Sequence, residues 1–167
     1  MTAAAGANRL GVFMPPIRVA AAVTAFVVAA TAIAHDAAPS KAERAIDYRH
    51  SVYHVIGWNV APMGDAVGGK IPFNKDVFAM QAARVAALAP MLPEGFPDGS
   101  YVKGKTEAKP EIWTNRAEFE ELMKRLADKS AALAEIAKSG DLAKIKPAFT
   151  DLTQVCKSCH DKFREKD

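Results

Sequence analysis

The sequence predicts an all-α protein, an antiparallel four-helix bundle in which one long crossover joins the second helix to the third. Three observations support this prediction. After residue 34 the apolar residues recur at helical spacing, and the alternation typical of strands is almost absent. Gly and Pro clusters divide the chain into four helical segments, and one connection, residues 91–114, is long. The 167 residues suffice for one ordinary domain.

Residues 1–34 are predicted to be a secretory signal peptide, cleaved before His35. Arg9 and Arg18 are its only charged residues, and the apolar stretch after Arg18 ends in Ala-Ile-Ala, a small-x-small cleavage signal. This stretch has 16 residues, whereas a membrane-spanning helix needs about 20, so an uncleaved anchor is the less favoured alternative. Met14 is an alternative start of the chain. Export predicts a periplasmic protein that is not attached to the membrane after cleavage.

The first predicted helix runs from Ser40 to Ala66. One stripe at helical spacing is expected to face inward. The stripe consists of Arg49, Val52, Ile56 and Met63. Pro62 predicts a bend near the end of this helix, and the pair Gly68 and Gly69 ends it, because glycine readily leaves the helical conformation.

The second predicted helix begins after a cap at Asn74 and runs to about Pro90. Its apolar face consists of Phe78, Val85, Leu88 and Leu92. The crossover that follows, residues 91–114, contains several prolines and glycines together with charged residues. This composition predicts an ordered connection rather than a low-complexity linker.

The third predicted helix begins at Asn115, which forms with Glu118 a pattern that resembles a capping box. Its inward stripe consists of Phe119, Leu122, Leu126, Leu133 and Ile136. Ser139 and Gly140 end this helix, and Asp141 can cap the fourth. Pro147 lies inside the fourth helix and predicts a kink or a restart, because it removes one backbone hydrogen bond.

The fourth predicted helix carries the sequence Cys-Lys-Ser-Cys-His near the end of the chain. Its apolar stripe has spacings of 3, 4, 3 and 4 residues, the heptad pattern of a packed bundle. The stripe consists of Phe149, Leu152, Cys156, Cys159 and Phe163. The two cysteines are therefore expected on the buried stripe, with His160 beside them.

Cys156 and Cys159 are the only cysteines of the chain, and four chemistries are open to them. A redox pair normally begins a helix that follows a strand, a structural zinc site needs four ligands, and a disulfide here would distort the helix. Covalent haem attachment fits best, because in Cys-x-x-Cys-His the thiols add to the haem vinyl groups and the histidine supplies an axial nitrogen. The motif therefore predicts one covalently attached haem c, with His160 as a ligand of its iron.

Three stretches carry a family resemblance: "CHDKFR" on the last helix, "YRHSVYHVIGWN" (residues 48–59) on the first, and "KPEIW" (residues 109–113) in the crossover. Together they resemble the cytochrome c′ family over the whole predicted mature chain, residues 35–167. The resemblance implies a haem in the bundle core near the C-terminal helix. It also implies a homodimer built on the first two helices, and a protein that binds NO and CO or transfers electrons rather than an enzyme.

The resemblance further implies that Nε2 of His160 is the fifth ligand of the iron. Low-spin relatives are similar to this chain but place a methionine on the first helix, four residues before a glycine. Here Tyr53 stands four residues before Gly57, which implies a five-coordinate, high-spin haem with its open side crowded by Tyr53. The alternatives are that Tyr53 is an ordinary core aromatic and that the iron is six-coordinate and low-spin. Met63 and Met80 are expected to be core residues.

Further haem contacts are implied at matched positions. Arg49 resembles the family's arginine that pairs with a haem propionate through charge-assisted hydrogen bonds. His50 takes a haem-contact position where the family more often has glutamine, and Glu107 lies at a haem-edge position. Arg164, four residues after His160, is expected to flank the proximal side on the helix and to donate to a ligand bound there. An ordinary solvated charge is the alternative for each arginine.

A peroxidase-like enzyme is a further hypothesis, which requires His50 or His54 to swing inward as a base. His54 is expected to face outward. These two histidines also form a weak candidate surface metal site, and His35 a candidate copper ligand at the mature N-terminus. The formal net charge is +3 and acidic and basic residues are mixed, so no nucleic-acid partner is predicted.

Overall fold

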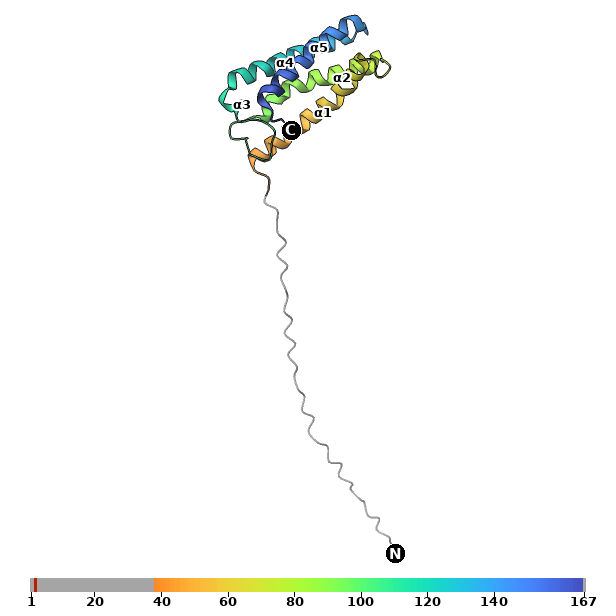
Figure 1. The fold of residues 1–167 in the computed structure, drawn as a ribbon. Coiled ribbons are helices and arrows are strands. Elements are labelled where there is room, and N and C mark those ends of the chain that lie inside the picture. The colour runs from red at the N-terminus through yellow and green to blue at the C-terminus, as the bar shows by residue number, and fades with distance from the viewer. Residues whose placement is uncertain (1, 3–37, 167) are drawn as a thin grey trace. The chain divides into compact units, whose positions relative to one another are not determined.

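The computed structural model describes residue 2 and residues 38–166. Apart from residue 2, the predicted signal peptide therefore lies outside the described residues, as do its cleavage site and His35. Four long helices form an antiparallel bundle, which confirms the predicted fold class (Figure 1). They are α1 (Lys41–Val67), α2 (Lys75–Leu88), α4 (Arg116–Ala137) and α5 (Leu142–Phe163). Within the described residues, none of the helices is long and apolar enough to cross a membrane.

The long crossover between α2 and α4 contains two short helical segments. The 3-10 helix η1 (Ala89–Gly95) continues directly from α2, and the single turn α3 (Glu111–Thr114) precedes α4. The α-helical part of the second segment therefore ends at Leu88. Pro90 explains this end, because it has no N–H to donate to the helix behind it.

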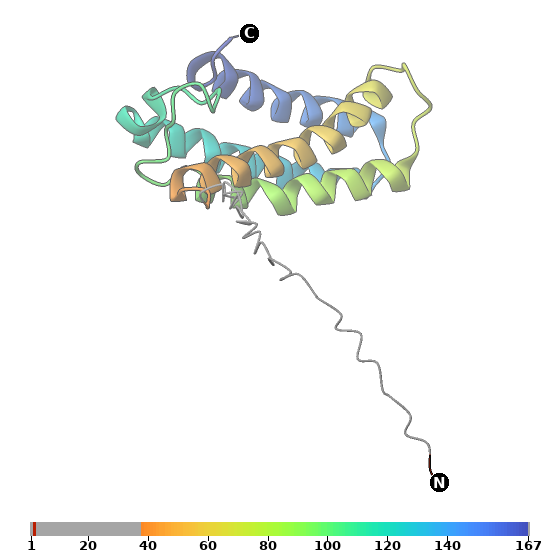
Figure 2. The same ribbon diagram turned by 90° about the horizontal axis from the view of Figure 1, so that it is seen from below.

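The two ends of the bundle differ in how the chain connects its helices. The α1–α2 and α4–α5 connections lie together at one end, called here the loop end (Figure 2). The crossover, the start of α1 and the end of α5 lie at the other, called here the crossover end. There an isolated backbone bridge joins Ala108 to Arg164. The crossover is thereby fastened to the helix that carries the two cysteines.

Side-chain caps begin three of the four long helices. Ser40 and Glu43 form a complete capping box at α1, with the Ser40 Oγ accepting from the Glu43 N–H and the Glu43 carboxylate accepting from the Ser40 N–H. Asn74 accepts from two backbone N–H groups of α2 at 3.1 Å, and Asp141 accepts from one of α5 at 2.9 Å. The caps predicted at Asn74 and Asp141 are confirmed.

The capping box predicted at Asn115 is wrong. Its side chain makes no capping hydrogen bond, and its backbone (φ −112°, ψ 46°) is not extended. The reason is that α3 ends immediately before it, and the Asn115 N–H donates to the Glu111 carbonyl at 2.8 Å. Asn115 is therefore both the residue that ends α3 and the residue that precedes α4, and its backbone conformation is that of a helix end.

Pro147 does not restart the fourth helix, because α5 is continuous from Leu142 to Phe163. The N–H that proline lacks would have bonded the carbonyl of Ala143, one turn earlier. Ala143 is exposed, so water can satisfy that carbonyl. Pro62 likewise lies inside α1, which continues to Val67.

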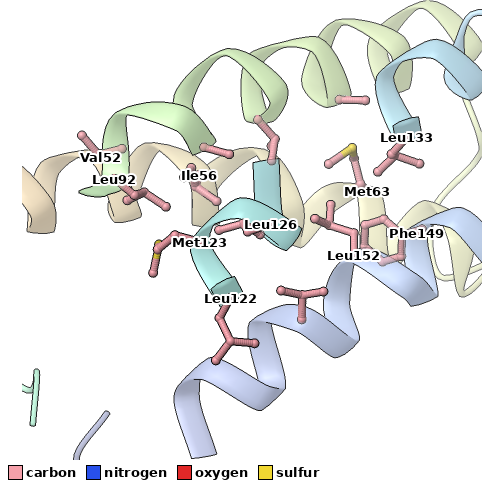
Figure 3. Packing of buried hydrophobic residues seen from close by; sticks show 14 of the residues in the cluster. Val52, Ile56, Met63, Leu92, Leu122, Met123, Leu126, Leu133, Phe149 and Leu152 are labelled. Atoms are coloured by element: carbon pink, nitrogen blue, oxygen red, sulfur yellow. The ribbon is translucent and has the colours of Figure 1, made fainter. Parts of the chain in front are cut away.

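The predicted apolar stripes meet in one core (Figure 3). At the loop end Met63 and Leu133 are fully buried and point toward each other. The rings of Phe78 and Phe149 meet edge to face there, with centroids 6.3 Å apart. This part of the bundle is filled by side chains, as expected for a close-packed interior.

Candidate functional site

A cavity of about 510 Å³ lies between α1 and α5 at the crossover end. These two helices pack against each other less extensively than α1 with α2 or α4 with α5. The volume is within the range of about 300–1,000 Å³ that is usual for cofactor sites. Most of the lining side chains are apolar, and its aromatic part consists of Tyr53, Phe96, Phe119 and Phe163.

The two cysteines are half-buried on the α5 wall of this cavity. Burial raises the pKa of the Cys156 thiol, and burial together with Cys156 raises the pKa of Cys159 to about 11. A redox pair needs a thiol pKa below the usual range, so these thiols are unsuited to that role. Both thiols are free, and no group of three or more His, Cys, Asp or Glu able to hold a metal ion occurs within residues 38–166. The disulfide and structural-zinc interpretations therefore have no support in this structure.

His160 stands one turn after Cys156, exposed on the same wall. Burial by the cavity walls lowers the pKa of its imidazole and Arg164 lowers it further, whereas Asp161 and Glu107 act in the opposite direction. The neutral imidazole is the form that binds a metal ion. Five consecutive residues of α5 thus present two thiols and one imidazole to a single cavity.

Tyr53 lines the cavity from α1, and its half-buried ring packs edge to face on Phe96 with centroids 6.4 Å apart. Burial raises the pKa of its phenol, and the thiols of Cys159 and Cys156 add to this shift while Arg49 opposes it. The hydroxyl therefore stays protonated at neutral pH. The structure brings Tyr53 and both cysteines into one cavity.

His50 and His54 are exposed and line the rim of this cavity. His50 also lines a neighbouring polar pocket, together with Glu43 and Lys105. His54 is exposed, as expected for an outward-facing side chain, but it also lines the mouth of the cavity. The cavity extends over two adjacent faces of α1, so a residue one step around the helix from Tyr53 still reaches its mouth.

Arg49 is only 1% exposed, although it is a charged side chain. Its Nη1 donates to the carbonyls of Gly95 at 2.9 Å and Ser100 at 3.2 Å, and its Nη2 donates to the Thr106 Oγ1 at 2.8 Å. The guanidinium lies over Phe96, 4.9 Å from the ring centroid. Its Nε has no hydrogen-bond partner within residues 38–166. A buried cation on the cavity wall therefore keeps one unsatisfied donor.

Gly95 makes this arrangement of Arg49 possible. A Cβ at Gly95 would lie 2.6 Å from the Arg49 Cβ. Because Gly95 has no side chain, η1 can approach α1 closely enough for the Gly95 carbonyl to accept from the Arg49 guanidinium.

Glu107 and Arg164 form an ion pair that lines the cavity with His160. The Arg164 Nε donates to the Glu107 Oε2 at 2.7 Å, and Nη2 lies 2.6 Å from the same oxygen. The expectation that Arg164 continues the helix is wrong, because α5 ends at Phe163 and Arg164 is extended (φ −115°, ψ 137°). The chain turns there toward the crossover.

Met123 of α4 lines the cavity, and the sequence analysis missed it. It lies four residues after Phe119 and three before Leu126, so helical spacing places it beside the predicted stripe and could have identified it. Of the two methionines that the sequence analysis considered, Met63 is buried at the loop end and Met80 is exposed on α2, and neither lines the cavity.

The residues present fit the predicted haem c. The cavity wall is mostly apolar, as a porphyrin requires, and two thiols stand at one turn's spacing beside an imidazole with a lowered pKa. The unsatisfied Nε of Arg49 suits an anionic propionate.

Comparisons with known proteins agree with this fit. The sequence model of the family described as Cytochrome C' matches residues 44–164. A cytochrome c′ of Rubrivivax gelatinosus is 37% identical over 126 residues, which cover 73% of this chain and 95% of that relative. The family model spans all the cavity-lining residues, from Arg49 to Arg164.

Two solved structures have the same fold. Cytochrome c prime from Shewanella frigidimarina is 40% identical, with a TM-score of 0.73, and the similarity covers 77% of this chain and 100% of that one. A variant of cytochrome c prime from Alcaligenes xylosoxidans, ferrous and with bound NO, is 28% identical, with a TM-score of 0.71. That similarity covers 78% of this chain and 100% of the other.

Proposed function

The chain belongs to the cytochrome c′ family, whose members carry a covalent haem c, and from this premise we propose a periplasmic protein with a five-coordinate, high-spin iron that binds NO and CO or transfers single electrons. One observation carries the proposal. The cavity presents Cys156, Cys159 and His160 from α5 and, from α1, a protonated tyrosine where a ligating methionine would stand in low-spin relatives.

Cys156 and Cys159 would hold the haem through thioether bonds, and Nε2 of His160 would supply the axial nitrogen. Three attachments within five residues would fix the group to one helix wall. When bound, the haem supplies the iron at which NO or CO binds. Replacing both cysteines with alanine should abolish covalent haem, as measured by intact mass and by haem retention under denaturing conditions.

Tyr53 would crowd the α1 side of the haem. A phenol whose pKa is raised stays neutral, and a neutral phenol is a poor ligand compared with a thioether or an imidazole. The side chain would therefore leave the sixth position open to small diatomic ligands while excluding larger ones. The substitution Tyr53→Met tests this role, since it should convert a high-spin ferric spectrum into a low-spin one.

Visible and EPR spectra of the purified ferric protein test the open site directly. A high-spin signal is expected, followed by a shift on addition of NO to the reduced protein. A low-spin signal with a methionine-to-iron charge-transfer band would overturn the proposal.

A six-coordinate electron carrier is the second candidate, and Met123 is the observation that favours it, because its thioether lines the cavity. The variant Met123→Leu separates the two candidates. A spectrum unchanged by this substitution supports the open site, whereas conversion from low-spin to high-spin would identify Met123 as the ligand.

The charged residues of the cavity would hold the edge of the haem. Arg49 would donate its unpaired Nε–H to a propionate, and His50 and Glu107 would contact the haem edge from the rim. Arg164 would donate to a ligand that takes the place of the His160 imidazole, whose bond to the iron would then break. In the variant that lacks both cysteines, a lower affinity for non-covalently added haem after Arg49→Leu would support the first of these roles.

Binding, rather than catalytic turnover, is proposed because no strong base faces the cavity interior from the α1 side. The phenol of Tyr53 stays protonated, and His50 and His54 stand at the rim. Fast oxidation of the ferric protein by hydrogen peroxide in a stopped-flow experiment would contradict this and promote a peroxidase-like function.

We further propose that α1 and α2 form a homodimer interface. Trp58 on α1 is 81% exposed, and Val55, Val77 and Met80 are exposed on the same two helices. Large exposed apolar side chains at adjacent positions are typical of an interaction surface. Trp58→Glu should yield a monomer in analytical ultracentrifugation. Tyr101→Glu, which also replaces an exposed aromatic side chain with a charge but lies in the crossover, should leave the dimer intact.

N-terminal sequencing of the exported protein should begin at His35 if the proposed periplasmic location is right.

A further inference from the structure

A short segment of the crossover, residues 106–109, holds both walls of the cavity together. On one side the Thr106 Oγ1 accepts from Arg49 of α1 at 2.8 Å. On the other side the Lys109 N–H donates to the Phe163 carbonyl at 2.9 Å, and the Glu165 N–H donates to the Glu107 carbonyl at 2.7 Å. The backbone around Glu107 is therefore fixed to the last residue of α5 and to the residues directly after it.

The side-chain pair of Glu107 and Arg164 lies inside this backbone bridge. The two side chains are 55% and 44% exposed, and an exposed pair on independent elements would be loosely held. Here Ala108 is bridged directly to Arg164, so the backbone sets the distance between the two side chains before they pair. Less conformational entropy is then lost on pairing, and the guanidinium has a defined position.

Arg164 has an alternative position available. Arg164 follows the last helical residue, and its N–H donates to the His160 carbonyl at 3.3 Å. The side chains of His160 and Arg164 both line the cavity. A long guanidinium side chain without an acceptor can lie along the cavity or extend into water. The carboxylate of Glu107 selects one of these positions.

We propose that Glu107 is a positioning residue, which holds the Arg164 guanidinium where it can donate to a small ligand that would bind in place of the His160 imidazole. This inference rests on the proposed haem function, since that ligand is NO on the reduced protein. The requirement concerns geometry as well as charge, because Oε2 of Glu107 accepts a hydrogen bond from Nε of Arg164 and also lies 2.6 Å from its Nη2.

The test is a double-mutant cycle on the holoprotein, with the rate of NO release from the reduced protein as the readout. Glu107→Gln should accelerate release about tenfold, the change expected for the loss of one charge-assisted hydrogen bond. Arg164→Gln should give the same change, and adding Glu107→Gln to it should change nothing further. Glu107→Asp, which keeps the charge, should restore part of the effect.

Glu165→Gln is the matched control. It removes the same unit of charge one residue from Arg164, and the Glu165 side chain makes no ion pair within residues 38–166. EPR of each NO complex reports its coordination number, a signature that a merely structural role would not change. Equal effects of Glu107→Gln and Glu165→Gln, or additive effects of Glu107→Gln and Arg164→Gln, would overturn the inference.

The wild-type protein separates this inference from the proposed function. If reduced wild-type protein does not bind NO, the proposed function fails. If it binds NO and Glu107→Gln releases it at the wild-type rate, only the role of Glu107 fails.

Discussion

The loop end and the crossover end of the bundle follow the same heptad pattern, but side chains fill the first and leave a cavity in the second. At the loop end the inward positions carry Met63, Phe78, Leu133 and Phe149, which meet and exclude solvent. At the crossover end the equivalent stripes carry a charged side chain, Arg49, on α1 and two small thiols on α5. The walls there remain apart, and a cavity of about 510 Å³ lies between them.

The difference shows that periodicity and residue type carry separate information. Periodicity sets which face of a helix turns inward, and along α5 the stripe from Phe149 to Phe163 consists of buried and half-buried residues. Residue type sets whether the facing side chains fill the space. Stability is therefore expected to depend mainly on the loop end, and ligand chemistry on the crossover end.

Leu133→Ala at the loop end should have the largest effect on stability. Leu133 is fully buried, so truncation removes apolar contacts and leaves a void, at a cost of about 2–5 kcal/mol in the free energy of unfolding. Denaturant unfolding of the holoprotein measures this cost. The ferric spectrum should stay unchanged, and a spin-state change would contradict the separation of the two ends.

Arg49→Leu at the crossover end should cost less, about 1–3 kcal/mol, because it leaves the buried carbonyls of Gly95 and Ser100 without a donor. Unlike Leu133→Ala, it should also change the haem spectrum. Arg84→Leu is the control, since Arg84 is exposed on α2 and its loss should change stability by less than about 0.5 kcal/mol. Equal losses in the two variants would show that Arg49 makes no stabilising contact.

The sequence predicted the helices and the residues of the α5 wall because both depend on local spacing. It could not predict that Arg164 turns away from α5 to meet Glu107, since the two are 57 positions apart and nothing local links them. The inward position of Met123 follows from its spacing to Phe119 and Leu126, but the cavity that it lines does not, because other segments of the chain also form that cavity. The error at Asn115 has a different cause: the single turn of α3 directly before it was invisible in the spacing.

Asn74→Ala and Asn115→Ala compare the same substitution at the two ends. Asn74 caps α2 at the loop end with two hydrogen bonds, whereas Asn115 makes none at the start of α4. Losing the first cap should lower the free energy of unfolding by about 1 kcal/mol. The second substitution should change it by less than about 0.5 kcal/mol. Comparable losses in thermal unfolding would mean that Asn115 caps α4 in solution.

The smallest effect is expected from acid at the crossover end. The hydrogen bond from Lys105, with those from Ser40, lowers the pKa of Glu43 from 4.5 to about 2. Because the folded state holds this carboxylate ionised, its contribution is complete above pH 4.5 and is lost as the pH falls toward 2. The Glu43 side chain is partly exposed and its partner Lys105 is exposed, so solvent screening keeps the contribution small. An NMR titration of the Glu43 carboxyl measures the pKa, and Lys105→Gln should return it toward 4.5; an unchanged titration in that variant would show that the crossover does not hold the start of α1.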